Sequence, residues 1–342
     1  MPVRVEQLDP LGSMGDAELV VPLHNSVMGE LFPWRMPKSV DEFRAGFAAP
    51  EAAFRFVAIP DEQRSSLHAL GVVRTWTDGT NPQLVFAEVL VRSDSRRRGF
   101  GRLVLEAVVE IAEASDRTLV LVDTVDTVPA GEAFASSVGA DIGMREHVSR
   151  ASIEDLPFDV LEAWEADAAV RAADYELLAW EDGYSEDHLD QIAALFVMAD
   201  EDMPYEDAAF EPITETGESL RTRIDASEPF VSRVTTVAVH RPSGEAVGFS
   251  ELIRRRSDPA TLFTTLTIVH REHRGHGLGK WIKADVIARA RARFPHARFI
   301  QTENAFSNAA MLAINDAIGF APSCTLTSFQ LSTDGIRRYL DR

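Results

Sequence analysis

A run of alternating glycines in the C-terminal half of the chain has the spacing of a phosphate-binding turn. Gly275, Gly277 and Gly279 follow an apolar segment, residues 262–269, that predicts a strand, and precede an apolar periodicity over residues 281–290 that predicts a helix. Glycines let a turn expose its backbone N–H groups, and the start of a helix adds a partial positive charge. The segment therefore predicts a cradle for a diphosphate, to which nearby basic side chains add charge: Arg271, Arg274 and Lys280.

The same pattern of residues occurs a second time, in the N-terminal half. Four of its residues have counterparts at a constant distance of 178 positions: Val91 with Val269, Arg96 with Arg274, Gly99 with Gly277 and Gly101 with Gly279. A constant offset at all four positions indicates a duplicated domain.

The elements predicted around each turn follow the same order. A strand leads into the turn, a helix leaves it, and a second strand, residues 118–122 or 298–301, leads to a second helix. This alternation predicts an α/β fold whose ligand lies beyond the strand ends. We predict two tandem domains, each a mixed twisted sheet flanked by helices. The N-terminal domain covers residues 1–150, a linker helix covers residues 151–173, and the C-terminal domain covers residues 174–342.

Both patterns resemble the motif of the GNAT superfamily, the acyl-CoA N-acyltransferases. That motif is a strand Val, four residues, Arg or Gln, two residues, Gly, one residue, and Gly or Ala, and it fits the segment from Val269 to Gly279. The resemblance implies that the strand separates from its neighbour at this point and pairs with the pantetheine arm of acetyl-CoA, while the turn holds the diphosphate. A dinucleotide-binding fold is disfavoured, because its fingerprint needs a third glycine at a spacing that this turn lacks.

A second motif of the same superfamily is present only in the C-terminal half. Asn308 precedes a predicted helix that ends at Gly319 and Phe320, and in relatives such an Asn contacts the cofactor. The N-terminal half lacks the Asn and has Ala140 in place of the Phe. This asymmetry resembles the tandem type represented by mycothiol synthase, in which the C-terminal half is catalytic. It predicts a degenerate N-terminal domain.

The predicted contacts with acetyl-CoA come from the strand end, the turn and the second motif. In the C-terminal domain they are Ile268, Val269, Arg274, Gly275, His276, Gly277, Leu278, Gly279, Lys280, Asn304 and Asn308. In the N-terminal domain the matching residues are Val91, Arg96, Gly99 and Gly101. Whether the N-terminal domain binds CoA is open at this stage, and we expect weak binding there or none.

Acetyl transfer to an amine needs a base near the nucleophile and a proton for the leaving thiolate. Many relatives supply that proton from a Tyr at the position of Asn315, whose amide cannot act as an acid. The candidate bases are Glu303, at the end of the strand that flanks the cleft, and Glu251, on a strand predicted over residues 246–253. Glu88 is the candidate base of an active N-terminal site. Alternate strand residues face opposite sides of a sheet, so the direction of each side chain stays open.

Residues 181–218 are rich in acids and contain no Lys or Arg. Three of these acids, Asp200, Asp202 and Glu206, are predicted in a loop after an amphipathic helix. We expect them to recognise a cationic substrate, because a clustered negative field raises the local concentration of an amine. The alternative is a solvated acidic surface.

The formal net charge of −20 makes nucleic acid and anionic membranes poor partners. We expect no metal site, because the single Cys324 and the three turn histidines, His270, His273 and His276, complete no closed ligand set. No segment reaches the roughly 18 apolar residues of a membrane helix. The sequence predicts a cytoplasmic protein, a monomer or a homodimer, without an apolar signal region.

Together these features predict an N-acetyltransferase that moves acetyl from acetyl-CoA to a primary amine of a small cationic metabolite or antibiotic. Two alternatives stay open: a CoA-binding sensor or regulatory protein without turnover, and an acyltransferase that uses a longer acyl-CoA. Release of CoA in the presence of amines distinguishes an enzyme from a sensor, because a sensor binds acetyl-CoA without releasing CoA from it. The acceptor itself stays open, because fold does not fix substrate.

Overall fold

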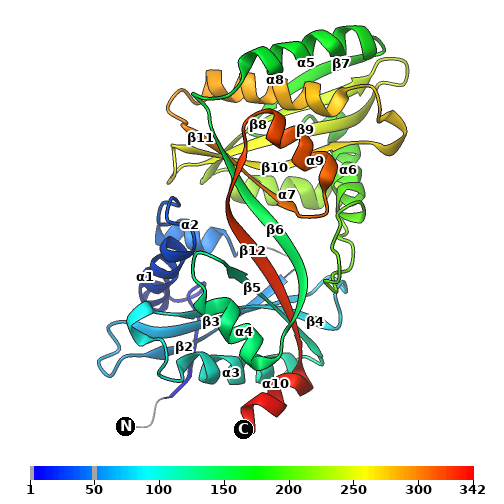
Figure 1. Cartoon of the computed structure of the whole chain (residues 1–342). Helices are drawn as coiled ribbons and strands as arrows, with labels where there is room; N and C mark the ends of the chain where they lie inside the picture. Colours follow the sequence, from blue (N-terminus) through cyan, green and yellow to red (C-terminus); the bar gives the residue numbers. More distant parts are fainter. Residues whose placement is uncertain (1–3, 48–51) are drawn as a thin grey trace. The chain divides into compact units, whose positions relative to one another are not determined.

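The computed structural model describes residues 4–47 and 52–342, which form two compact units (Figure 1). Unit 1 contains Met1–Glu146, Tyr205–Glu211 and Cys324–Arg342, and unit 2 contains His147–Pro204 and Pro212–Ser323. Each unit has a mixed sheet with helices on both faces, as the repeated sequence pattern predicts.

In unit 1 the strand order is β1 (Glu6–Leu8), β2 (Ala52–Pro60), β3 (Leu67–Trp76), β4 (Leu84–Val91), β5 (Leu119–Val125) and β12 (Ala321–Ser332). Strands β4 and β5 pair in parallel, whereas the pairs β1–β2, β2–β3, β3–β4 and β5–β12 are antiparallel. Helices α1 (Met14–Leu31) and α2 (Val40–Ala45) cover one face of the sheet, and α3 (Phe100–Ala114) covers the other. Neighbouring strand residues show this division, since Phe56 packs with α1 and Val57 packs with α3.

In unit 2 the strand order is β6 (Asp141–Ser152), β11 (Phe299–Ala305), β10 (Thr261–Val269), β9 (Glu245–Arg255), β8 (Val231–His240) and β7 (Tyr175–Glu181). Helices α6 (Leu189–Glu201) and α7 (Gly217–Ser227) cover one face. The other face carries α8 (Leu278–Arg293), and α5 (Phe158–Arg171) packs along α8. Helix α9 (Ala309–Ala317) follows β11 in unit 2, as α4 (Ala130–Val138) follows β5 in unit 1.

The predicted strands and helices around both glycine turns are confirmed. The short 3-10 turns Ser93–Ser95 and Arg271–His273 lie between each strand and its glycines. The compact units differ from the predicted domain boundaries in three places: residues 147–150 lie in unit 2, and residues 205–211 and 324–342 lie in unit 1. The last of these differences has a clear cause. Residues Leu326 to Ser332 of β12 pair antiparallel with β5, and helix α10 (Thr333–Leu340) packs on α3.

The segment Tyr205–Glu211 is held in unit 1 by two kinds of contact. Asn81 and Glu211 exchange hydrogen bonds, each backbone N–H donating to the other side chain at 2.9 Å. The ring of Phe210 packs edge-on against Trp76 at 6.4 Å between centroids. Asn81 is only 2% exposed, so this anchor is part of the core of unit 1.

Candidate active site

The two parallel strands at the centre of unit 2 separate from one another. Strands β10 and β11 are paired only from Thr261 to Phe263, although β10 continues to Val269 and β11 to Ala305. On its other side β10 has a β-bulge between Thr264 and Leu266 in its pairing with β9. The separation leaves backbone groups of β10 without a strand partner on the β11 side, among the described residues. An extended ligand arm can pair with them, as the sequence resemblance implies.

The turn that follows β10 has the backbone conformation expected of a phosphate cradle. Gly275 and Gly277 adopt φ angles of +87° and +81°, a region that L-residues disfavour, and Gly277 is the N-cap of α8. The first N–H groups of a helix have no intrahelical acceptor and carry the positive end of the helix dipole. The turn thus directs several N–H donors to one place.

The basic side chains near the turn are engaged within the protein. Arg274 donates from Nε to the Val269 carbonyl at 3.0 Å and pairs with Asp202. Arg271 pairs with Asp202 at 2.7 Å and with Glu201 at 2.9 Å. The sequence interpretation of Arg271 and Arg274 as extra phosphate partners is therefore weakened, and the backbone N–H groups become the main donors of the cradle.

Asparagines line the helix α9 side of the separated strands. Asn308 is the N-cap of α9, where its side chain accepts from the Met311 N–H at 3.2 Å. Asn315 donates from Nδ2 to Asn304 at 2.7 Å, is 2% exposed, and leaves a buried Oδ1 without a hydrogen-bond partner in the described part of the chain. A buried unsatisfied acceptor is costly in a finished core, and it fits a site that a polar ligand group completes.

Glu251 lies at the centre of a buried polar network on the face of the sheet covered by α6 and α7. Its carboxylate accepts from the Tyr184 hydroxyl at 2.7 Å, from Thr235 at 3.0 Å, from Thr265 in the bulge at 2.9 Å and from Arg233 at 3.4 Å. Burial, with the adjacent Glu251 charge, raises the pKa of the Tyr184 hydroxyl well above its usual value. Glu251 is 2% exposed, and both of its carboxylate oxygens accept hydrogen bonds from the protein.

Glu303 lies on the same face of the sheet as Glu251. Leu252 and Ile300 pack with α8, and strand residues alternate between faces, so Glu251, Gln301 and Glu303 point away from α8. Glu303 is exposed and accepts from Gln301 Nε2 at 3.1 Å. The direction of Glu303, which the sequence alone left open, is thus toward the α6 and α7 side.

The three predicted substrate acids lie in different surroundings. Asp200 lies inside α6 and not in the predicted loop, is 8% exposed, and accepts from the Ile213 N–H at 2.8 Å. Asp202 is the C-cap of α6 and pairs with Arg271 and Arg274. Glu206 belongs to the segment held in unit 1. The structure therefore gives Asp200 and Asp202 internal partners and does not join all three in one described site.

Unit 1 repeats the turn but fills the space above it. Arg97 and Gly99 adopt φ angles of +62° and +86°, matching Gly275 and Gly277. A Cβ added at Gly101 would lie 3.6 Å from the Phe134 ring and 3.7 Å from Val91, whereas a Cβ at Gly279 would meet only Val269, at 3.8 Å. Phe134 of α4 thus lies between the strand end and the helix start of unit 1, where unit 2 is open.

Glu88 of unit 1 has an unusual environment on β4. Burial, together with the charge of Asp123, raises its pKa to about 7 against the opposing effect of Lys38. Its Oε2 is buried and has no hydrogen-bond partner among the described residues. Strand β4 pairs with β5 only as far as Phe86, as β10 pairs with β11 only as far as Phe263, and Glu88 lies on β4 beyond that pairing.

Lys283 of α8 is a residue that the sequence analysis did not single out. It is 2% exposed, and its Nζ lies 5.3 Å from the centroid of the Phe320 ring. The available signal was its position: Lys283 stands between the buried residues Ile282 and Ala284, and its counterpart in unit 1 is the buried Leu105. A charged residue at a core position is the unusual feature.

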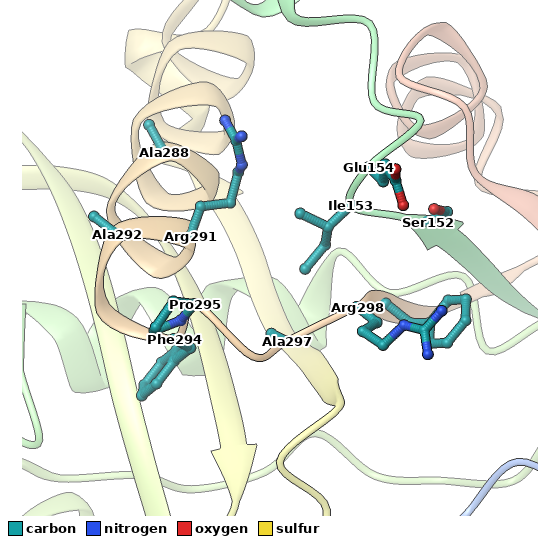
Figure 2. Close-up of a pocket in the computed structure, with 11 residues that line it drawn as sticks. Ser152, Ile153, Glu154, Ala288, Arg291, Ala292, Phe294, Pro295, Ala297 and Arg298 are labelled. Atoms are coloured by element: carbon teal, nitrogen blue, oxygen red, sulfur yellow. The ribbon is translucent and has the colours of Figure 1, made fainter.

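Two of the pockets formed by the described residues lie in unit 2. One, of about 610 Å³, lies at the C-terminal end of α8, where Arg291, Phe294 and Ile153 line it. Figure 2 shows its lining side chains. This pocket lies at the opposite end of α8 from the turn, and we assign it no part in the chemistry. The other, of about 690 Å³, lies beside the turn, and four glutamates contribute to its lining: Glu201, Glu215, Glu245 and Glu272.

Within residues 4–47 and 52–342, no three His, Cys, Asp or Glu side chains lie close enough together to hold a metal ion. Over the same residues, no helix is both long enough and apolar enough to cross a membrane.

The fold of this chain is similar to that of known proteins. Residues 192–320 match the model of the acetyltransferase (GNAT) family. A tandem GNAT protein from the clavulanic acid biosynthesis pathway has a similar structure, with a TM-score of 0.73, 21% identity, and coverage of 96% of this chain and 99% of that one. A GCN5-related N-acetyltransferase from Sphaerobacter thermophilus has a TM-score of 0.63 and 14% identity, with coverage of 96% of this chain and 95% of that one. The N-myristoyltransferase of Saccharomyces cerevisiae has a TM-score of 0.59 and 11% identity, with coverage of 97% of this chain and 81% of that one. None of the curated protein sequences matches this chain.

Residues 192–320 therefore match the acetyltransferase (GNAT) family, and the chain as a whole has a fold similar to that of a tandem GNAT protein. The matched segment carries the glycine turn of unit 2, together with Glu251, Lys283, Glu303 and Asn315.

Proposed function

We propose that unit 2 binds acetyl-CoA at the turn Arg274–Lys280 and transfers its acetyl group to a primary amine of a small molecule. The observation that carries this proposal is the combination of a β10 edge that is not paired with β11 beyond Phe263 and a glycine turn with positive φ angles at the start of α8. The β10 edge supplies partners for the amide groups of pantetheine, and the turn supplies N–H donors for the diphosphate.

The reaction needs little chemistry from the protein beyond positioning and proton transfer. The amine nitrogen attacks the thioester carbonyl carbon, a C–N bond forms, the C–S bond breaks, and the CoA thiolate leaves with the electron pair. We propose Glu303 as the base that takes the amine proton, because it is exposed and faces the α6 and α7 side. Glu251 is buried and accepts four hydrogen bonds, so we propose it as a positioning residue that holds Thr265 and Tyr184.

A cationic acceptor is supported by charge. The pocket beside the turn is lined by four glutamates and by Arg271; Glu201 pairs with Arg271, and Glu215 pairs with Arg223. With the net charge of −20, the other two, Glu245 and Glu272, favour an amine over an anionic acceptor. We propose a small metabolite or antibiotic as the acceptor class, with acetyl-CoA as the donor and without a metal. We also propose that the protein acts in the cytoplasm and that one site per chain, the one in unit 2, is active.

The test is release of CoA from acetyl-CoA in the presence of a panel of primary amines, with the acetylated product identified by mass. Glu303→Gln should lower kcat by about 100-fold or more, the usual effect of losing a general base. Glu154→Gln, an exposed acid elsewhere in unit 2, is the control and should leave kcat unchanged. Tight binding of acetyl-CoA without CoA release from any amine would favour a sensor instead.

A further inference from the structure

Lys283 is a buried amine without a hydrogen-bond partner. Its residue exposure is 2%, and within the described residues its Nζ makes no hydrogen bond. Its Nζ lies over the ring of Phe320, 5.3 Å from the ring centroid. An isolated buried ammonium is strongly unfavourable, and natural cores avoid it unless a partner or a ligand compensates.

The helix face that carries Lys283 is the face that carries Gly279. The two residues are four positions apart, so they lie one above the other on α8. In unit 1 the matching residues are Gly101, which contacts Phe134 of α4, and Leu105, which packs in the same core cluster as Phe134. This face of α3 thus points to the helix that follows the next strand. By the same register, Lys283 points to the α9 side of unit 2, where no aromatic ring covers Gly279.

The contacts of Phe320 link Lys283 to residues of α9 and β11 that border the strand gap. The Phe320 N–H donates to the Asn315 carbonyl at 3.1 Å, and the Asn315 side chain donates to Asn304 on β11 at 2.7 Å. Asn304 lies on β11 beyond its last position of pairing with β10. Lys283 and Asn315, each with a buried polar side-chain atom that has no hydrogen-bond partner among the described residues, are therefore both neighbours of Phe320.

We propose that Lys283 donates its proton to the CoA sulfur as the C–S bond breaks. This rests on the proposed function of unit 2. The thiolate takes the electron pair of the C–S bond and the proton of Lys283, which leaves CoA as a thiol and Lys283 as a neutral amine. Lys283 regains a proton from water after CoA leaves, and the proton taken by the base returns to water, so charge and protons balance. Asn315 cannot perform this step, because an amide is not an acid at neutral pH.

The acidity of Lys283 suits this role. Burial lowers the pKa of its ammonium to about 8, close to the value of about 8.5 for an ordinary thiol, so the transfer is nearly balanced. The other charged groups on helices α5, α8 and α9 are Asp159, Glu162, Glu165, Asp167, Arg171, Lys280, Asp285, Arg289, Arg291, Arg293 and Asp316. Burial alone causes the lowered pKa of Lys283, and none of these groups forms an ion pair with it in the part of the chain that the structure describes.

The leading variant is Lys283→Leu, which copies Leu105 of unit 1 and is expected to fold. We expect its kcat to fall by about 100-fold or more, while the dissociation constant of acetyl-CoA stays within about two-fold and the thermal midpoint does not fall. If Lys283 has only a structural role, the kcat of the stable variant should be unchanged. Arg291→Leu, at the far end of the same helix, is the control and should keep the kcat of the unmodified protein.

A second variant separates proton donation from a simple effect of charge. Lys283→Arg keeps the positive charge, but a guanidinium does not release its proton, so we expect kcat to stay low. In the unmodified protein kcat should fall as pH rises above about 8, and that limb should be absent from Lys283→Leu. Full activity of either variant overturns the inference. An unmodified protein that releases no CoA with any amine overturns the proposed function as well, so the two failures are distinguishable.

Discussion

The carboxylate of Asp202 is paired with the guanidinium of Arg274, which ties the end of helix α6 to the phosphate-binding turn of unit 2. Unit 1 has the same arrangement, since Glu30 in the last turn of α1 pairs with Arg96 at 2.7 Å. In both units the Arg also donates to the carbonyl of the motif Val, at 3.3 Å in unit 1 and 3.0 Å in unit 2. The motif Arg thus links its turn to the end of a helix, and its partner acid lies beside the turn that we propose as the cofactor site.

Asp202→Asn should therefore affect acetyl-CoA more than the amine. Each exposed ion pair contributes little by itself, but Asp202 pairs with two arginines, so we expect acetyl-CoA affinity to fall by about two- to ten-fold. Calorimetry measures this change, with Asp207→Asn in unit 1 as the control. A raised KM for the amine with unchanged acetyl-CoA affinity would instead support the sequence hypothesis that Asp202 recognises a cationic substrate.

Gly277→Val should abolish acetyl-CoA binding. A β-branched residue at a φ of +81° is strained by about 1–2 kcal/mol, and its side chain obstructs the approach of a diphosphate to the backbone. Gly99→Val is the matched control, because Gly99 has a φ of +86° and pays the same strain in unit 1. We expect both variants to lose similar stability and only the first to lose binding. Equal loss of binding in both would contradict the assignment of the site to unit 2.

Acetyl-CoA should bind with a stoichiometry near one per chain. Unit 1 has the turn conformation of unit 2, but Phe134 lies where the turn of unit 2 is open. Calorimetric titration of the full chain gives the number of sites directly. Two equivalent sites would show that the Phe134 ring moves aside, and Glu88 would then become the candidate base of the second site.

Glu251→Gln should destabilise unit 2 by about 3 kcal/mol. The change leaves the Arg233 guanidinium, whose side chain is 7% exposed, without its buried counter-charge, and loss of one partner of a buried pair costs about 3–5 kcal/mol. Urea unfolding followed by tryptophan fluorescence measures the effect. Glu245→Gln, an exposed acid on the same strand, is the control and should change the unfolding free energy by no more than about 0.5 kcal/mol.

Lys283 should make the stability of unit 2 depend on pH between about 8 and 10.5. Burial lowers the pKa of the folded-state ammonium to about 8, whereas 10.5 is its ordinary value. In this interval the unfolded chain binds more protons, so the free energy of unfolding rises with pH, by about 3 kcal/mol in total. Lys283→Leu removes the free-energy cost of burying the ammonium, so the stability advantage of the variant over the unmodified protein should shrink as pH rises from 7.5 to 10. An advantage that stays constant over this range would refute a buried titrating lysine.

The parts of the site that the sequence predicts well are local in the chain. The Gly277 turn follows from a short strand-to-helix pattern, and an Asn before a helix, such as Asn308, follows from capping preference. The repeat at a fixed offset adds the two-unit architecture. Each of these predictions needs only residues that are close in the sequence or related by a constant shift.

The parts that the sequence misses depend on distant contacts. The partner of Arg274 lies 72 residues earlier in the chain, and the ring that covers Gly101 comes from a later helix. Asp200 was expected in a loop but lies in helix α6, because the apolar period of that helix does not mark its last turn. The burial of Lys283 follows from the register of α8 against its surroundings, which single-residue preferences do not encode.

The placement of β12 constrains how the protein is made. Residues 324–342 complete the sheet and the helical layer of unit 1, yet they are synthesised after all of unit 2. Unit 1 therefore cannot finish folding before unit 2 has been synthesised, and the edge of β5 stays unpaired until then. A nascent chain stalled before residue 324 should expose that edge to chaperones, and a C-terminal truncation should harm the N-terminal unit first.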